Sequence, residues 1–171
     1  MELVEVEARR YNWGALGCGC LSTAAHLGTE LVELARAQNA AEASQYHIED
    51  HILRAVYLTA PAVPTASVVL AALTGDISDA ARHVFFDLLL ALAAGEGTAL
   101  DPDLAGRDLV EECRAAIRNG LWILYAEVMH PVSVDTASNA FETLSLVEED
   151  PDRLDRVREV AADNLRSDLR K

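Results

Sequence analysis

The amino-acid sequence predicts an all-α protein, and three observations indicate that class. Hydrophobic residues make up 51% of the chain, but aromatic residues only 5%, and alanine and leucine dominate, a mix that favours helices over sheets. Apolar residues recur at helical spacing in segment after segment. Glycines, prolines and capping residues separate these segments. We therefore expect about seven helices joined by short loops, and no strand pair.

Three helices are predicted in the first part of the chain. The stripes of the first two are Leu27, Leu31, Leu34, Ala35 and Ile48, Ile52, Ala55, Thr59. Pro61 and Pro64 then precede a segment that is apolar on all sides up to Leu73, which predicts a central helix, because the first turn of a helix tolerates proline. In Thr74-Gly75-Asp76, glycine should end that helix and Asp76 should cap the next.

Four more helices are predicted after residue 76. The first buries a stripe that includes Phe85 and Leu88, and residues 94–102 follow as a loop rich in glycine. Asp108 begins one long helix that ends at His130-Pro131. Ser133 caps the next helix, and Asp150-Pro151 begins the last one, whose stripe extends to Leu169.

Length and charge limit the classes of partner. The 171 residues fit a single domain, residues 1–171. The formal net charge is −14, and residues 61–147 hold twelve acidic and four basic residues. Such a surface repels phosphate groups, so we expect neither nucleic acid nor anionic membrane as a partner. Acidity favours a basic protein partner, although it also serves solubility alone.

The three cysteines, Cys18, Cys20 and Cys113, indicate reduced thiols. The first residues, Met1 to Glu7, are acidic where a secretory signal is basic. An odd number of cysteines without such a signal is typical of the cytoplasm. No uncharged run reaches the roughly 18 residues that a membrane span needs. We expect a cytoplasmic protein in which Cys113 lies in the core.

One segment resembles a known family. Residues 46–64, YHIEDHILRAVYLTAPAVP, place a histidine and a tyrosine before an Ala-Pro-x-x-Pro entry to an apolar helix. Together with Glu112-Cys113 and residues 146–151, LVEEDP, this order is similar to bacterial HEAT-like repeat proteins over roughly residues 13–169. The family often has Gln-Gly beside the tyrosine, where this chain reads Asp50-His51-Ile52, so no role of that pair is carried over.

The resemblance implies a short α-solenoid of helical hairpins, and HEAT-like arrays act as binding surfaces. Some small proteins of this kind are immunity partners of secreted toxins. The resemblance therefore suggests an immunity or regulatory role, and no enzymatic activity follows from it.

Two groups of residues are candidates for metal or redox sites. His47 and His51 are four residues apart on one helix face, which is metal-ligand spacing, but the acids between them do not fit the zinc-protease pattern. A third ligand from His26, His83 or His130 has no support in the sequence. In Cys18-Gly19-Cys20 only one residue separates the thiols, which favours close packing over metal or redox chemistry. We expect no metal and no cofactor.

The candidate binding residues fall into two groups. Large aromatic side chains are common in binding hot spots, with core filling as the alternative. The residues are Asp50, His51, Arg54 and Tyr57, and then Trp122, Tyr125, Glu127 and His130. No catalytic residue is assigned. The sequence thus predicts a non-catalytic protein-binding module, and the alternative is a small enzyme or small-molecule binder with a pocket between hairpins.

Overall fold

The computed structural model describes residues 2–171, and 61% of the chain is helical. The prediction of a mostly helical protein is therefore confirmed. The described residues form ten α-helices instead of about seven, together with three short 3-10 helices and a small three-stranded sheet. The single domain and the solenoid arrangement stay predictions. Within residues 2–171, no helix combines the length and apolarity that crossing a bilayer requires.

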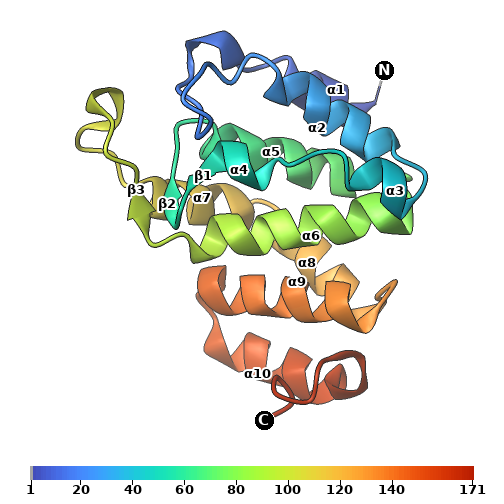
Figure 1. Ribbon diagram of the computed structural model, residues 1–171. Helices are drawn as coiled ribbons and strands as arrows, with labels where there is room; N and C mark the ends of the chain where they lie inside the picture. The colour runs from blue at the N-terminus through green and yellow to red at the C-terminus, as the bar shows by residue number, and fades with distance from the viewer. Residues whose placement is uncertain (1) are drawn as a thin grey trace.

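The helices succeed one another in layers from the N-terminus to the C-terminus (Figure 1). The α-helices are α1 (Leu3–Ala8), α2 (Leu27–Arg36), α3 (Ala40–Ala43), α4 (Glu49–Ile52), α5 (Ala62–Leu73), α6 (Asp79–Ala94), α7 (Leu109–Arg118), α8 (Leu121–Met129), α9 (Val134–Val147) and α10 (Pro151–Val160). The 3-10 helices are η1 (Trp13–Ala15), η2 (Pro102–Leu104) and η3 (Ala162–Asn164). Helix α5 packs against α1, α6 and α7, and α9 packs against α6 and α8.

The core lies between these layers. Phe85, Phe86 and Phe141 are fully buried, and Leu88 is 4% exposed, so the predicted stripe at Phe85 and Leu88 is confirmed. Cys113 is also buried, as expected, and burial raises the pKa of its thiol to about 12. Helix α10 has no buried residue and lies at the C-terminal edge of the stack (Figure 1).

The helix predicted across residues 48–59 is wrong beyond Ile52. Helix α4 ends there, and the chain forms a hairpin of β1 (Leu53–Arg54) and β2 (Tyr57–Leu58), with β3 (Gly97–Thr98) parallel to β2. The carbonyl of His51 accepts hydrogen bonds from the Gly19 amide and the Thr59 hydroxyl. These hydrogen bonds thus occupy the His51 carbonyl oxygen, which a longer helix would need for its own backbone hydrogen bond. Ala55, with φ of 56°, then turns the chain.

The single long helix predicted from Asp108 to His130 is also wrong, because it is two helices. Helix α7 ends at Arg118, and α8 begins at Leu121 after Gly120. A Cβ at Gly120 would lie 2.3 Å from the Leu70 side chain of α5. The break therefore lies at Asn119-Gly120, a local stop signal that the apolar stripe masked, where a neighbouring helix also approaches the backbone.

The predicted helix starts are mostly confirmed. The side chains of Asp108, Ser133 and Asp150 each accept a hydrogen bond from a first-turn amide. One cap was misassigned, since Ser78 and not Asp76 caps α6. The last helix is shorter than its stripe suggested, because α10 ends at Val160.

Candidate metal centre

The first group of predicted site residues lies beside the small sheet. Asp50 is exposed on α4, while Arg54 and Tyr57 are exposed cross-strand partners. Arg54 and Tyr57 line a shallow depression of about 490 Å³. His51 is partly buried and contacts the loop of residues 16–26 instead. The structure thus separates His51 from the other three.

The second group lies on α8 and at its end. Trp122 is 73% exposed and His130 is exposed, whereas Tyr125 and Glu127 are 5% and 4% exposed. Glu127 accepts hydrogen bonds from Arg82, from the Val132 amide and from the Thr136 hydroxyl. Only Trp122 and His130 are therefore available on the surface, and Glu127 has a structural role.

Tyr125 donates a hydrogen bond to Glu148. Burial and this hydrogen bond raise the pKa of Tyr125. Burial also acts to raise the pKa of Glu148, but hydrogen bonds from Tyr125 and nearby amides outweigh it and hold that pKa below its ordinary value. The pair therefore stabilises the fold at pH values above the ordinary pKa of a glutamate. This stabilisation is lost as the pH falls through the lower pKa that Glu148 has in the folded state.

We expect Tyr125→Phe to lower the free energy of unfolding by about 1.5–3 kcal/mol near neutral pH, because Glu148 loses a charge-assisted hydrogen bond. Urea denaturation at several pH values measures the effect, which should shrink in acid. The exposed Tyr57→Phe is the control, with a change within about 0.5 kcal/mol. Equal effects of Tyr125→Phe in acid and at neutral pH would contradict this assignment of Glu148.

Four potential metal ligands converge next to α4. Cys18 and Cys20 come from the loop before α2, His26 from the residue that precedes α2, and His51 from α4. One ligand atom from each of the four lies within 4.8 Å of the other three. In Figure 1 this loop, in blue, descends beside α4 at the end of the molecule that carries the sheet. Residues 25 and 33 positions apart along the chain thus meet in one cluster.

The shape of the loop explains why the cysteines reach His51. The Gly19 amide donates a hydrogen bond of 2.8 Å to the His51 carbonyl. A Cβ at Gly19 would lie 2.5 Å from the Leu53 carbonyl oxygen and 2.6 Å from that of Asp50. Glycine therefore lets the loop backbone contact the backbone of α4, which places one cysteine on each side of the contact.

Local hydrogen bonds close the loop on itself. The Cys18 amide donates to the Ser22 carbonyl and the Leu21 amide to the Cys18 carbonyl. Leu21 has φ of 67°, a left-handed conformation that is costly for a leucine. Its side chain is 81% exposed, so packing does not compensate for that cost. Strain of this kind is typical of functional loops.

Two of the distances within the cluster are close to those of a tetrahedral zinc site. At zinc bond lengths, two nitrogens lie about 3.3 Å apart, a nitrogen and a sulfur about 3.6 Å, and two sulfurs about 3.8 Å. The His26 Nε2 and His51 Nδ1 atoms are 3.2 Å apart, and Cys18 Sγ is 3.2 Å from the same Nδ1. All four ligand atoms lie within 4.8 Å of one another, so side-chain adjustments would be needed to bring them to bonding distance of one ion.

Hydrogen bonds link the cluster in the absence of an ion, since Cys18 Sγ also lies 3.7 Å from the His51 carbonyl oxygen, to which it can donate. The His51 Nδ1 atom has two polar neighbours at 3.2 Å, His26 Nε2 and Cys18 Sγ. A ring nitrogen carries either one proton or one lone pair in the ring plane, so it satisfies one such neighbour at a time. Two ring nitrogens and one sulfur thus converge, with His51 Nδ1 at 3.2 Å from each of the other two atoms, a spacing that metal ligands also have.

The electrostatics of the cluster favour a bound cation. Burial, and then the nearby His26, lower the pKa of His51, which keeps its imidazole neutral, the form that binds metals. Burial, and then the neighbouring Cys20, raise the pKa of Cys18 to about 11, so two thiolates do not persist there without a positive partner. The negative charge of Glu30 acts on both Cys18 and His51. A divalent ion would neutralise two thiolates.

The sequence analysis did not predict this site, because it assigned Cys18 and Cys20 to close packing and found no support for His26 as a ligand. His51 was paired with His47, which is exposed and not part of the cluster. The signal that could have found the site is the order Cys-x-Cys, then His26 at a helix start, then a further histidine. This signal is weak because 25 positions separate His26 from His51 along the chain.

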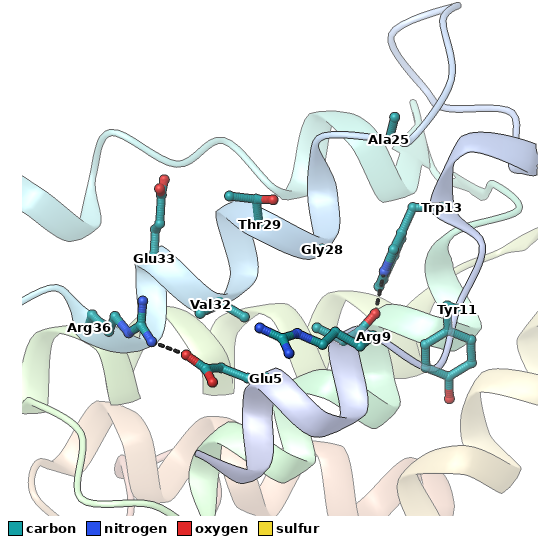
Figure 2. Close-up of a pocket in the computed structure, with 11 residues that line it drawn as sticks. Glu5, Arg9, Tyr11, Trp13, Ala25, Gly28, Thr29, Val32, Glu33 and Arg36 are labelled. Atoms are coloured by element: carbon teal, nitrogen blue, oxygen red, sulfur yellow. Dashed lines mark hydrogen bonds and ion pairs between the residues drawn. The ribbon is translucent and has the colours of Figure 1, made fainter. Parts of the chain in front are cut away.

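A second candidate for a small-molecule site lies between α1 and α2. This pocket of about 360 Å³ is lined by Tyr11, Trp13 and several charged residues. Figure 2 shows the ion pair from Arg36 to Glu5 at one side and the Trp13 indole hydrogen bond at the other. Neither histidine nor cysteine lines it, so it lacks the nucleophiles and bases of the metal cluster.

No protein family, no curated protein and no solved structure matches this chain. The cluster is therefore interpreted from its own geometry.

Proposed function

We propose that this chain is a non-catalytic helical binding protein whose N-terminal loop is held in place by a structural zinc ion bound to Cys18, Cys20, His26 and His51. The observation that carries the zinc proposal is the convergence of four ligand atoms within 4.8 Å of one another. This proposal replaces the expectation of no metal, because that expectation depended on the lack of a third ligand for His51.

The donor set selects the ion and its role. Two thiolates and two imidazoles suit zinc, and harder ions such as magnesium prefer oxygen. Four protein ligands fill a tetrahedral shell and leave no position for water or substrate, which is the pattern of structural sites. Two thiolates also neutralise a divalent ion, which suits the buried Cys18.

The role of the ion follows from what its ligands connect. Cys18 and Cys20 belong to the loop, His26 leads into α2, and His51 lies directly before the β1–β2 hairpin. A bound ion would join three parts of the chain that otherwise meet through few hydrogen bonds. The ion would cross-link these three parts of the chain near the protein surface, where Cys20 is exposed.

Metal content tests the zinc proposal. Protein purified under reducing conditions should contain about one zinc ion per chain by elemental analysis. His51→Ala should lose the ion. His47→Ala is the matched control, since it removes an exposed histidine four residues away and should retain it. Zinc below about one-tenth per chain after reconstitution, or equal zinc in the two variants, would overturn the proposal.

The binding role rests on the resemblance to HEAT-like arrays and on the acidic surface. A basic protein is the partner that this charge favours, and an immunity or regulatory role in the cytoplasm is consistent with both. The exposed Trp122 supports the role, since a tryptophan of that exposure adds nothing to the core.

A further inference from the structure

A groove distant from the metal cluster in sequence lies between the α5–α6 turn and α8. Its volume is about 620 Å³. Leu73, Ile77 and Ile123 supply apolar lining, and the exposed Trp122 forms part of its wall. Three of the residues predicted from sequence to bind a partner line it, namely Trp122, Glu127 and His130.

The charges in the groove are not balanced. Three carboxylates, those of Asp76, Asp79 and Glu127, share it with the guanidinium of Arg82, which leaves two negative charges. Arg82 is paired with Glu127, and Glu127 is also held by Thr136. Within residues 2–171, the Asp76 and Asp79 side chains form neither a hydrogen bond nor an ion pair. The two exposed carboxylates are thus available to a cation.

Trp122 already contacts a cation, Arg153 of α10, which does not line the groove. The guanidinium carbon of Arg153 lies 5.8 Å from the centre of the indole ring, within the range of a cation–π contact. An aromatic ring, an apolar lining and unpaired carboxylates together match a side chain with an aliphatic stem and a positive end group.

We propose that this groove binds an arginine or lysine side chain presented by a basic protein segment. The stem would lie against Leu73, Ile77 and Ile123, with the charged group between Asp76, Asp79 and the Trp122 ring. The inference rests on the proposed binding role and is independent of the zinc proposal, because none of the four metal ligands lines the groove.

The test uses a nine-residue peptide with arginine at every third position, separated by glycine and serine, and a second peptide with citrulline in place of arginine. Citrulline keeps the shape of arginine and lacks its charge. Binding is followed by chemical-shift mapping of backbone amides and by tryptophan fluorescence. We expect the arginine peptide to perturb α8 and the α5–α6 turn, and the citrulline peptide to bind at least about tenfold more weakly.

Two variants with equal net charge separate the groove from general acidity. Asp76→Asn/Asp79→Asn removes the two carboxylates of the groove. Asp163→Asn/Asp168→Asn removes two exposed carboxylates near the C-terminus. The first should weaken the arginine peptide at least about fivefold, and the second less than about twofold. Trp122→Ala should also weaken it at least about fivefold, with circular dichroism as the check that it is folded.

Equal weakening by the two double variants, or chemical shifts away from the groove, would overturn the proposal and leave only general charge attraction. A basic protein partner that binds the wild type and all groove variants equally would overturn the groove while the binding role stands. Failure of the wild-type protein to bind the arginine peptide would also overturn the groove proposal, whatever the zinc content of the protein.

Discussion

Removal of the metal by a chelator is expected to lower the midpoint of thermal unfolding by roughly 8–16 °C. A ligand present at about 1,000 times its dissociation constant stabilises the folded state by about 4 kcal/mol, and each kcal/mol corresponds to roughly 2–4 °C for a protein of this size. Differential scanning calorimetry with and without EDTA measures the shift. Addition of excess zinc should restore the midpoint.

The His51→Ala variant separates metal loss from other effects of the chelator. It should unfold at the same temperature with and without EDTA, while His47→Ala should respond as the wild type does. A chelator shift of equal size in His51→Ala would show that the ion, if any, is bound elsewhere.

The size of this zinc effect should depend on pH in a direction that the ligands set. Because the pKa of Cys18 is raised to about 11 in the metal-free cluster, zinc must displace a thiol proton at neutral pH. Affinity should therefore fall about tenfold for each displaced proton as the pH drops by one unit. The difference between midpoints with and without EDTA should decrease steadily from about pH 8 to pH 6.

Gly19→Ala is expected to have the second large effect. The added methyl group would lie 2.5 Å from the Leu53 carbonyl oxygen, and this oxygen belongs to the backbone, so no side-chain rotation relieves the clash. The loop must move away from α4, which breaks the hydrogen bond from the Gly19 amide to His51. We expect a loss of about 1–3 kcal/mol in the free energy of unfolding and a zinc affinity lower by about 10- to 100-fold.

Gly14→Ala provides the matched comparison on the same N-terminal segment. A Cβ there meets its nearest atom at an ordinary distance of 3.7 Å, so stability should stay within about 0.5 kcal/mol of the wild type. Denaturant unfolding gives the stability, and competition with a zinc-binding dye gives the affinity. Equal zinc affinity in Gly19→Ala and wild type would contradict the role of this contact in positioning the cysteines.

Features that depend on a few neighbouring residues were predictable. Ser133 and Asp150 were identified as helix caps because a cap is a bond between a side chain and an amide three residues away. The helix after Pro61 was identified because proline is tolerated at that position and the following residues are apolar. The exposure of Trp122 was left open in the sequence, since both a core and a surface position fit its spacing.

Features that depend on another part of the chain were missed. The residues after Ile52 have the spacing of a helix, but the hairpin prevails because β2 pairs with β3 and the His51 carbonyl bonds to Gly19 and Thr59. Helix α7 ends before Gly120, where Asn119-Gly120 is a local stop signal and Leu70 of α5 packs against the glycine. Local propensity is a weak preference, and these contacts override it.

The sequence by itself therefore determined the helical class, most helix starts and the excess of acidic residues, because these are properties of composition and of near neighbours. Only the tertiary structure decided that Cys18, Cys20, His26 and His51 meet, and that Trp122 faces the same groove as Asp76 and Asp79. The physical reason is the same in both cases. The atoms that would hold a ligand come from segments far apart along the chain, and backbone contacts such as that of Gly19 with α4 bring them together.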